Sequence, residues 1–140
     1  QTSIMSAIPL PSAAEYRNRA SAHDYSRFLR AIHQDDLPYS HEILRMMKLP
    51  NGTHDRLVED APGIPQNTRI AHKTGTTAKT CGDVGIVYAR GENGKEYPYI
   101  IVGIVGSEDR MPGSEDRRGN TIRHVSGMVY RDMDQRYTLR

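Results

Sequence analysis

The sequence lacks tryptophan, has a single cysteine and contains no long apolar run. Because Cys81 has no second cysteine to pair with, an intrachain disulfide is excluded. Cysteine usage therefore does not indicate whether the protein works in an oxidising or a reducing compartment. A membrane-spanning helix needs roughly 20 consecutive apolar residues, and no stretch approaches that length. The 19 basic and 17 acidic residues are interspersed, so the sequence lacks the concentrated positive charge typical of a nucleic-acid-binding surface.

What remains is a polar globular chain. Its 140 residues, 36% of them hydrophobic and 26% charged, suffice for one domain with an apolar core. Eight prolines and twelve glycines indicate many loops. The chain begins at Gln1, without an initiator methionine or a signal-peptide pattern, so we expect a processed chain or a piece of a longer protein.

The N-terminal half predicts short helices over residues 21–66, after an irregular loop over residues 1–20. Ser21 is a candidate N-cap, with Asp24 placed three residues later as in a capping box. Apolar residues with helical spacing follow, up to about residue 33: Tyr25, Phe28, Leu29 and Ile32.

Two more short helices are expected in this half. Ser40 is a candidate N-cap for the second of the three helices. Either Asn51 or Thr53 can cap the third, which would carry Leu57 and Val58.

Strands are predicted over residues 67–105, with candidates at 68–76, 84–90 and 96–105. Asn93-Gly94 between the last two candidates is a strong hairpin signal. Asn120 is expected to cap a C-terminal helix over residues 120–137 that can cover the sheet. The sequence therefore predicts an α+β fold, in which short helices precede an antiparallel sheet of at least three strands.

The first strand candidate ends in Lys73-Thr74-Gly75-Thr76, where chemically useful groups lie close together. Lys73 supplies a positive charge, the threonines supply hydroxyl donors, and Gly75 lets a ligand approach the backbone. This combination favours capture of a carboxylate-bearing, peptide-like substrate along a strand edge. The alternative is a strand that simply runs into a Thr/Gly loop, and the triplet alone favours that alternative.

Other candidate sites carry weaker signals. Cys81 with His72 could form a thiol nucleophile and its base, but a lone cysteine is more often packed in a core. His72 is expected to face away from Lys73 and to pack beneath the strand. Asp83 is expected to be a turn residue. No histidine pair has metal-ligand spacing, and no cofactor is expected.

The wider context of the triplet resembles a known family. Residues 83–88, Asp-Val-Gly-Ile-Val-Tyr, begin seven positions after Thr76, and an Asn-Gly hairpin, an aliphatic strand and a C-terminal helix follow. This order is similar to the C-terminal half of the class A β-lactamase and penicillin-binding-protein superfamily of serine hydrolases. The resemblance covers most of residues 20–137 and implies part of a β-lactamase/transpeptidase-like fold.

The resemblance also implies roles for the triplet. Lys73 and Thr74 would bind the substrate carboxylate, and Gly75 would let the acyl chain lie against the strand. The backbone N–H of Thr76 would be one of two oxyanion-hole donors. The expected partners are a β-lactam or peptide-like carboxylate substrate and a missing N-terminal half of the domain. Periplasmic or extracellular localisation is implied as well.

Several family motifs are absent from these residues. No serine is followed by lysine three positions later, and no Ser-Asp-Asn occurs. Glu15 lies too close to Ser21 to match the family's deacylating glutamate. Val84 stands where many class A enzymes have a carboxylate-holding arginine, and Arg69 or Arg90 could substitute.

We therefore expect the C-terminal half of a serine acyl hydrolase that is not competent as residues 1–140 alone. The alternatives are a penicillin-binding-protein-like or inactive peptide-binding module, or a structural domain in which Lys73 is merely solvated.

Overall fold

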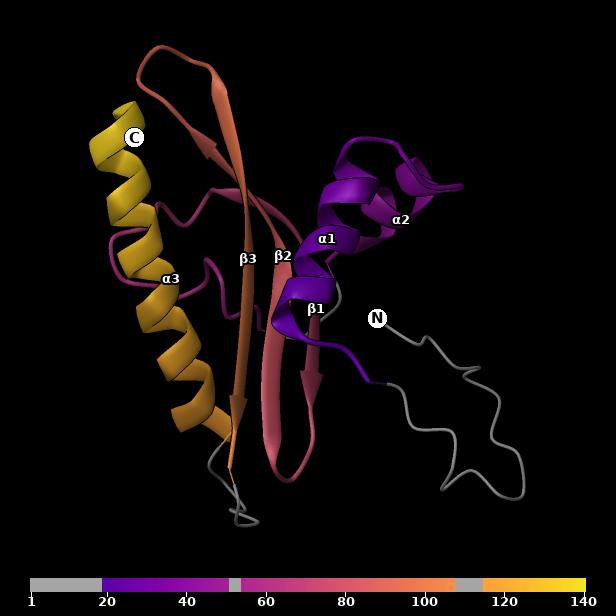
Figure 1. Cartoon of the computed structure of the whole chain (residues 1–140). Coiled ribbons are helices and arrows are strands. Elements are labelled where there is room, and N and C mark those ends of the chain that lie inside the picture. Colours follow the sequence, from indigo (N-terminus) through magenta and orange to yellow (C-terminus); the bar gives the residue numbers. More distant parts are fainter. Residues whose placement is uncertain (1–18, 51–53, 108–114) are drawn as a thin grey trace.

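The computed structural model describes residues 19–50, 54–107 and 115–140. Its centre is an antiparallel sheet with the strand order β1-β2-β3. Helices α1 and α2 lie on one face of this sheet and α3 on the other (Figure 1). The elements are α1 (Ala22–His33), α2 (Ser40–Met47), β1 (Arg69–Thr76), β2 (Thr80–Arg90), β3 (Glu96–Gly106) and α3 (Glu115–Tyr137). The predicted α+β fold is confirmed.

The start of α1 confirms the predicted cap. The Asp24 N–H donates to Ser21 Oγ at 3.1 Å, and the Ser21 N–H donates to Asp24 Oδ2 at 2.9 Å. Reciprocal bonds of this kind satisfy two backbone donors that a helix N-terminus would otherwise leave unpaired. Leu29 and Ile32 of the predicted apolar face are each only 1% exposed, and both pack against the sheet.

The third predicted helix is wrong. Residues 54–66 form bends and turns, while Asn51 and Thr53 lie outside the described residues. Asp55 Oδ1 accepts the N–H groups of residues 57–59, as it would at a helix N-terminus. The backbone then turns left-handed at Asp60 (φ 57°), and Pro62 follows. A helix therefore cannot continue past its first turn.

The starts of one strand and one helix differ from the prediction. Strand β2 begins at Thr80 rather than at residue 84, because Asp83 is paired in the strand instead of forming a turn. Helix α3 begins at Glu115 rather than at residue 120. Asn120 is not its cap, since the Asn120 Oδ1 accepts from the Arg123 side chain at 3.0 Å within the helix.

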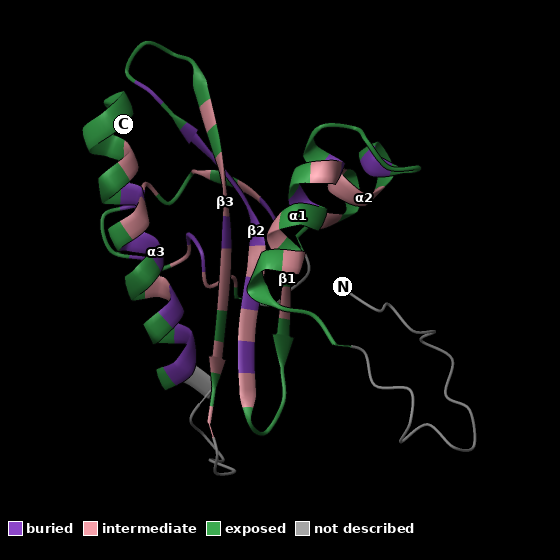
Figure 2. Cartoon of the chain, viewed as in Figure 1, coloured by how far each residue is buried: buried purple, intermediate pink, exposed green. Residues whose placement is uncertain are grey.

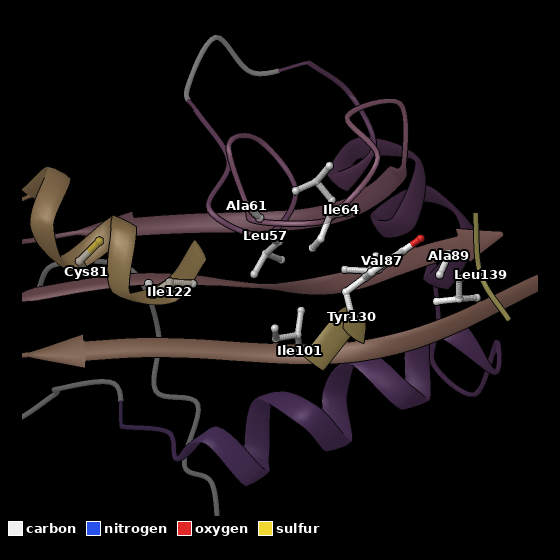
Figure 3. Packing of buried hydrophobic residues seen from close by; sticks show 11 residues of the cluster. Leu57, Ala61, Ile64, Cys81, Val87, Ala89, Ile101, Ile122, Tyr130 and Leu139 are labelled. Atoms are coloured by element: carbon white, nitrogen blue, oxygen red, sulfur yellow. The ribbon is translucent and has the colours of Figure 1, made fainter. Parts of the chain in front are cut away.

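The two faces of the sheet are buried by different partners (Figure 2). On the α3 face, the turn segment 54–66 and α3 close a cluster around Val87 of β2, which is 0% exposed (Figure 3). On the other face, α1 and α2 cover Ala71 and Ile86. None of the helices in the described part of the chain has the length and apolar character needed to cross a membrane. Strand β2 is thus the buried centre, and β1 lies at an edge where its backbone can be reached.

Candidate functional site

The end of β1 that carries Lys73-Thr74-Gly75-Thr76 lines an open hollow of about 590 Å³. Tyr25 of α1 and Ile104 of β3 contribute to its walls. A Cβ built on Gly75 would meet nothing within 4 Å, so the backbone faces open space at this position. The four motif residues therefore lie together along one accessible wall.

Along β1, the backbone N–H and C=O groups of successive residues point alternately toward β2 and toward the open edge of the strand. The Thr77 N–H donates to the Thr80 carbonyl at 2.7 Å, which makes 77 and 80 a hydrogen-bonded pair of the hairpin. In an antiparallel ladder such pairs alternate with pairs whose N–H and C=O groups point outward. Thr76 is therefore turned so that its N–H points away from β2. No described strand pairs with that outer edge of β1.

Two cations flank this strand end, and both bind neutral acceptors. Lys73 Nζ donates to the Thr74 carbonyl at 2.5 Å. The Arg56 guanidinium donates from Nη2 to Thr76 Oγ1 at 3.0 Å and from Nη1 to the Gly82 carbonyl at 3.3 Å. Within the described residues, neither cation forms an ion pair with a carboxylate. Lys73 lines the hollow, and Arg56 adds positive charge beside Thr76 from outside that lining.

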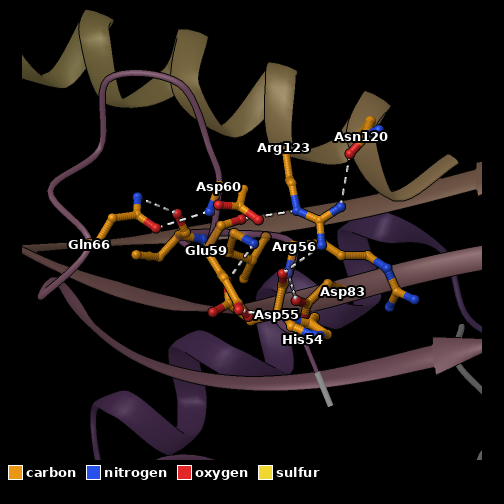
Figure 4. A network of polar contacts seen from close by, with 11 residues as sticks. His54, Asp55, Arg56, Glu59, Asp60, Gln66, Asp83, Asn120 and Arg123 are labelled. Carbon is orange, nitrogen blue, oxygen red and sulfur yellow. Dashed lines mark hydrogen bonds and ion pairs between the residues drawn. The ribbon is translucent and has the colours of Figure 1, made fainter. Parts of the chain in front are cut away.

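Arg56 comes from the turn segment and is held there by side chains from other elements (Figure 4). The Arg56 N–H donates to Asp83 Oδ2 at 2.8 Å. Arg123 of α3 donates to the carbonyls of Asp55 at 3.2 Å and Glu59 at 2.9 Å. Because these partners belong to β2 and α3, the segment is fixed relative to the sheet without secondary structure of its own.

Asp83 and His72 form a buried pair beneath the strand. Asp83 Oδ1 lies 2.9 Å from His72 Nδ1, and the residues are 0% and 8% exposed. Burial disfavours the charged imidazole, but the hydrogen bond and the negative charge of Asp83 outweigh burial and raise the pKa of His72 above 6.5. Asp55 adds to this rise, and Lys73 opposes it. The expectation that His72 packs beneath the strand is confirmed, whereas Asp83 as a turn residue is wrong.

The other sequence candidates lie elsewhere. Arg69 and Arg90 line a separate hollow, and Arg69 forms an ion pair with Glu96. Since Arg69 is four residues from Lys73 along β1, about 13 Å separates them. The expectation that Arg69 or Arg90 takes the carboxylate-holding position is therefore wrong. Cys81 is 0% exposed, as expected of a packed cysteine, and Glu15 lies outside the described residues.

Arg56 is the residue that sequence reasoning missed. It stands in a segment without motif or periodicity, 20 residues before Thr76. Nothing in the sequence around it singles it out. Such a segment can present a side chain to a neighbouring strand, but the spacing does not say which one.

Comparisons with known proteins concern the family and the fold. A model of the β-lactamase enzyme family matches residues 1–133. A mutant of PBP-A, solved as an acyl-enzyme complex with penicillin G, is 26% identical with a TM-score of 0.66, and the match covers 94% of this chain and 47% of that one. Another PBP-A structure is 28% identical with a TM-score of 0.65, covering 91% and 44%.

A β-lactamase from Chitinophaga pinensis is 20% identical with a TM-score of 0.59, covering 86% of this chain and 44% of that one, and shows the likeness of fold. The chain thus spans less than half the length of these solved structures. A comparison with curated proteins gave no match.

Proposed function

Because the chain belongs to the β-lactamase enzyme family, we propose that it is the C-terminal half of a serine β-lactamase-like acyl hydrolase. The attacking serine and its proton-transfer partners would come from residues outside these 140. This agrees with the absence of Ser-x-x-Lys and with the share of the solved relatives that the chain covers. Residues 1–140 would supply the wall that binds the substrate.

One observation carries this proposal: the open edge of β1 combines an outward N–H with two cations that have no carboxylate partner in the described residues. Lys73 and Thr74 would bind the carboxylate of a β-lactam or peptide-like substrate, since charge-assisted hydrogen bonds are about twice as strong as neutral ones. Gly75 would allow the acyl chain to lie along the strand like an added β-strand.

The Thr76 N–H would stabilise the oxyanion that forms when the substrate carbonyl is attacked. One oxyanion-hole donor can be worth about 2.7–4 kcal/mol of transition-state stabilisation, because it is already oriented when the charge develops. A second donor would come from the missing half. Arg56 would add positive charge beside Thr76, in place of the arginine absent at Val84.

A second candidate is a penicillin-binding-protein-like or catalytically inactive binding module. It is favoured by the PBP-A relative, whose acyl-enzyme complex with penicillin G was solved, and by the absence of a glutamate that matches the deacylating residue. In either case we propose periplasmic or extracellular localisation, as the family resemblance implies.

The test uses a longer protein in which residues 1–140 follow a segment containing Ser-x-x-Lys. Turnover of a coloured cephalosporin would support the hydrolase. A stable covalent adduct of penicillin G in the intact mass, without turnover, would support the penicillin-binding-protein-like alternative. Binding without an adduct would support an inactive module. If none of these is observed on folded protein, the proposal is wrong.

A further inference from the structure

We propose that Asp83 and His72 are positioning residues for Arg56, holding its guanidinium at the Thr76 end of β1. This inference rests on the proposed function in one respect only, namely that the ligand is an anion. The connection itself consists of contacts between three elements: β1, β2 and the turn segment 54–66.

The connection begins at the buried carboxylate of Asp83. One of its oxygens accepts from the Arg56 N–H at 2.8 Å, and the other lies 2.9 Å from His72 Nδ1. A buried carboxylate needs such partners, because an unpaired charge in the core is strongly unfavourable. Asp83 is therefore fixed by His72 on one side and fixes the backbone of Arg56 on the other.

The second step runs from the Arg56 backbone to its guanidinium. The side chain must reach both Thr76 Oγ1 and the Gly82 carbonyl, which adjoins Asp83 in β2. Arg56 lies outside helices and strands, so its backbone is held in place by side chains rather than by a ladder. Arg123 and Ser126 of α3 hold the carbonyls on either side of it, at Asp55 and Leu57, while Asp83 holds its N–H.

The charge on His72 connects this arrangement to pH. The charged groups that act on His72 are Asp83 from β2, Asp55 from the turn segment and Lys73 from its own strand. When His72 is protonated, its charge strengthens the hydrogen bond to Asp83, and the carboxylate is held more firmly against the Arg56 N–H. When His72 is neutral, this bond is weaker and Arg56 is positioned less firmly. By linkage, anion affinity falls as pH rises through the pKa of His72, and a bound anion raises that pKa.

The experiment is a binding cycle on the full chain, with penicillin G as the probe and NMR titration as the readout. Asp83→Asn should lower affinity roughly two- to tenfold, the range expected for one weakened hydrogen-bonded arrangement. The same substitution in an Arg56→Ala background should cause no further loss, because a positioning residue acts only through Arg56. A loss of equal size in both backgrounds would overturn the proposal.

Two controls separate positioning from general loosening. Asp134→Asn weakens a similar bond, since Asp134 Oδ1 accepts the Leu139 N–H at 2.7 Å, and it should leave affinity unchanged. His72→Asn keeps a donor near the Nδ1 position but cannot titrate. This variant should bind penicillin G with a pH-independent affinity between pH 5.5 and 8.5, whereas the His124→Asn control should keep the pH dependence of the unmodified chain.

A readout without ligand keeps the inference apart from the proposed function. In the unmodified chain, the Arg56 Nε–H signal should be resolved and its guanidinium rotation slow. Both features should be lost in His72→Ala and regained in His72→Asn. His72→Ala also replaces Asp83→Asn as the test variant if Asp83→Asn fails to fold. If the chain binds no penicillin G but Arg56 behaves this way, the proposed function fails and the positioning role stands. An Arg56 signal unaffected by His72→Ala would overturn the positioning role.

Discussion

An arginine lies at each end of strand β1, Arg69 within the strand and Arg56 from the turn segment, but the two have different partners. At the start of the strand, Arg69 is paired with Glu96, and its guanidinium carbon lies 5.8 Å from the centre of the Tyr88 ring. At the other end, Arg56 and Lys73 bind only neutral oxygens in the described residues. The charge of Arg69 is neutralised by a carboxylate of the protein, whereas the charges of Arg56 and Lys73 are not, within the part of the chain that the structure describes.

This difference separates the proposed ligand site from a structural ion pair. An exposed pair such as Arg69–Glu96 adds little to stability, typically about 0–1 kcal/mol. Cations held against neutral acceptors at an open backbone edge contribute no such pair, and their charge is not neutralised by a carboxylate in the described residues. Asp83 could have neutralised Arg56, but its carboxylate accepts from the Arg56 backbone N–H rather than from the guanidinium.

The largest expected difference between the two ends concerns stability. Asp83→Ala should lower the free energy of unfolding by about 3–5 kcal/mol, because it leaves His72 and the Arg56 N–H without their buried partner. Glu96→Ala at the other end should cost less than about 1 kcal/mol. Urea denaturation of both variants measures the contrast. Equal losses would mean that burial of the charge does not distinguish the two ends.

The next difference concerns binding. Lys73→Ala should weaken the affinity of the chain for penicillin G roughly 10- to 100-fold, the equivalent of about 1.5–3 kcal/mol for hydrogen bonds to a charged group. Arg69→Ala should change the affinity less than about twofold, since its charge is already matched by Glu96. NMR titration of the two variants compares them directly. A similar loss in both would show that net charge, rather than the Lys-Thr-Gly edge, attracts the ligand.

Patterns that depend on neighbours in the sequence predicted the fold well. The Ser21–Asp24 cap and the Asn93-Gly94 hairpin need only local spacing, and both are present in the structure. Of the apolar face predicted for α1, Leu29 and Ile32 are buried, while Tyr25 and Phe28 are exposed. Errors arose where a side chain from a distant element decides the local conformation. Asp83 was assigned to a turn because its partner, the N–H of Arg56, lies 27 residues earlier.

The candidate site shows the same division. Lys73, Thr74, Gly75 and Thr76 are contiguous, so their shared position on one strand end could be predicted. Arg56 could not, because a guanidinium that reaches the strand from a turn segment leaves no periodic trace in the sequence. Which of several arginines lies beside Thr76 depends on the register of β1 and β2 and on α3, which fixes the segment.

A smaller difference between the ends should appear as a function of pH. Since the folded-state pKa of His72 is raised, its contribution to stability is complete below about 6.5 and is lost as pH rises through the folded value. Urea midpoints should therefore fall across that window in the unmodified chain and stay level in His72→Asn. The Arg69–Glu96 pair contains no histidine, so Glu96→Gln should leave the slope of stability with pH unchanged there. A level profile in the unmodified chain would contradict the coupling of His72 to Asp83.

The smallest expected effect tests whether the Arg69 end fails to bind an anion because Glu96 neutralises its charge. Glu96→Gln keeps the size and polarity of the side chain but removes its negative charge, so stability should change by less than about 1 kcal/mol. What little is lost should shrink further as the salt concentration rises from 0.05 to 0.5 M, because salt screens exposed charges. Arg69 would then carry an unmatched charge, as Arg56 does, but away from the Lys-Thr-Gly motif and the outward N–H of Thr76. Penicillin G affinity should consequently stay within about twofold of the unmodified chain. A clear gain in affinity would mean that an unmatched cation alone is enough to make an anion site on this strand. The outward N–H of Thr76 would then not be needed to explain the difference between the two ends.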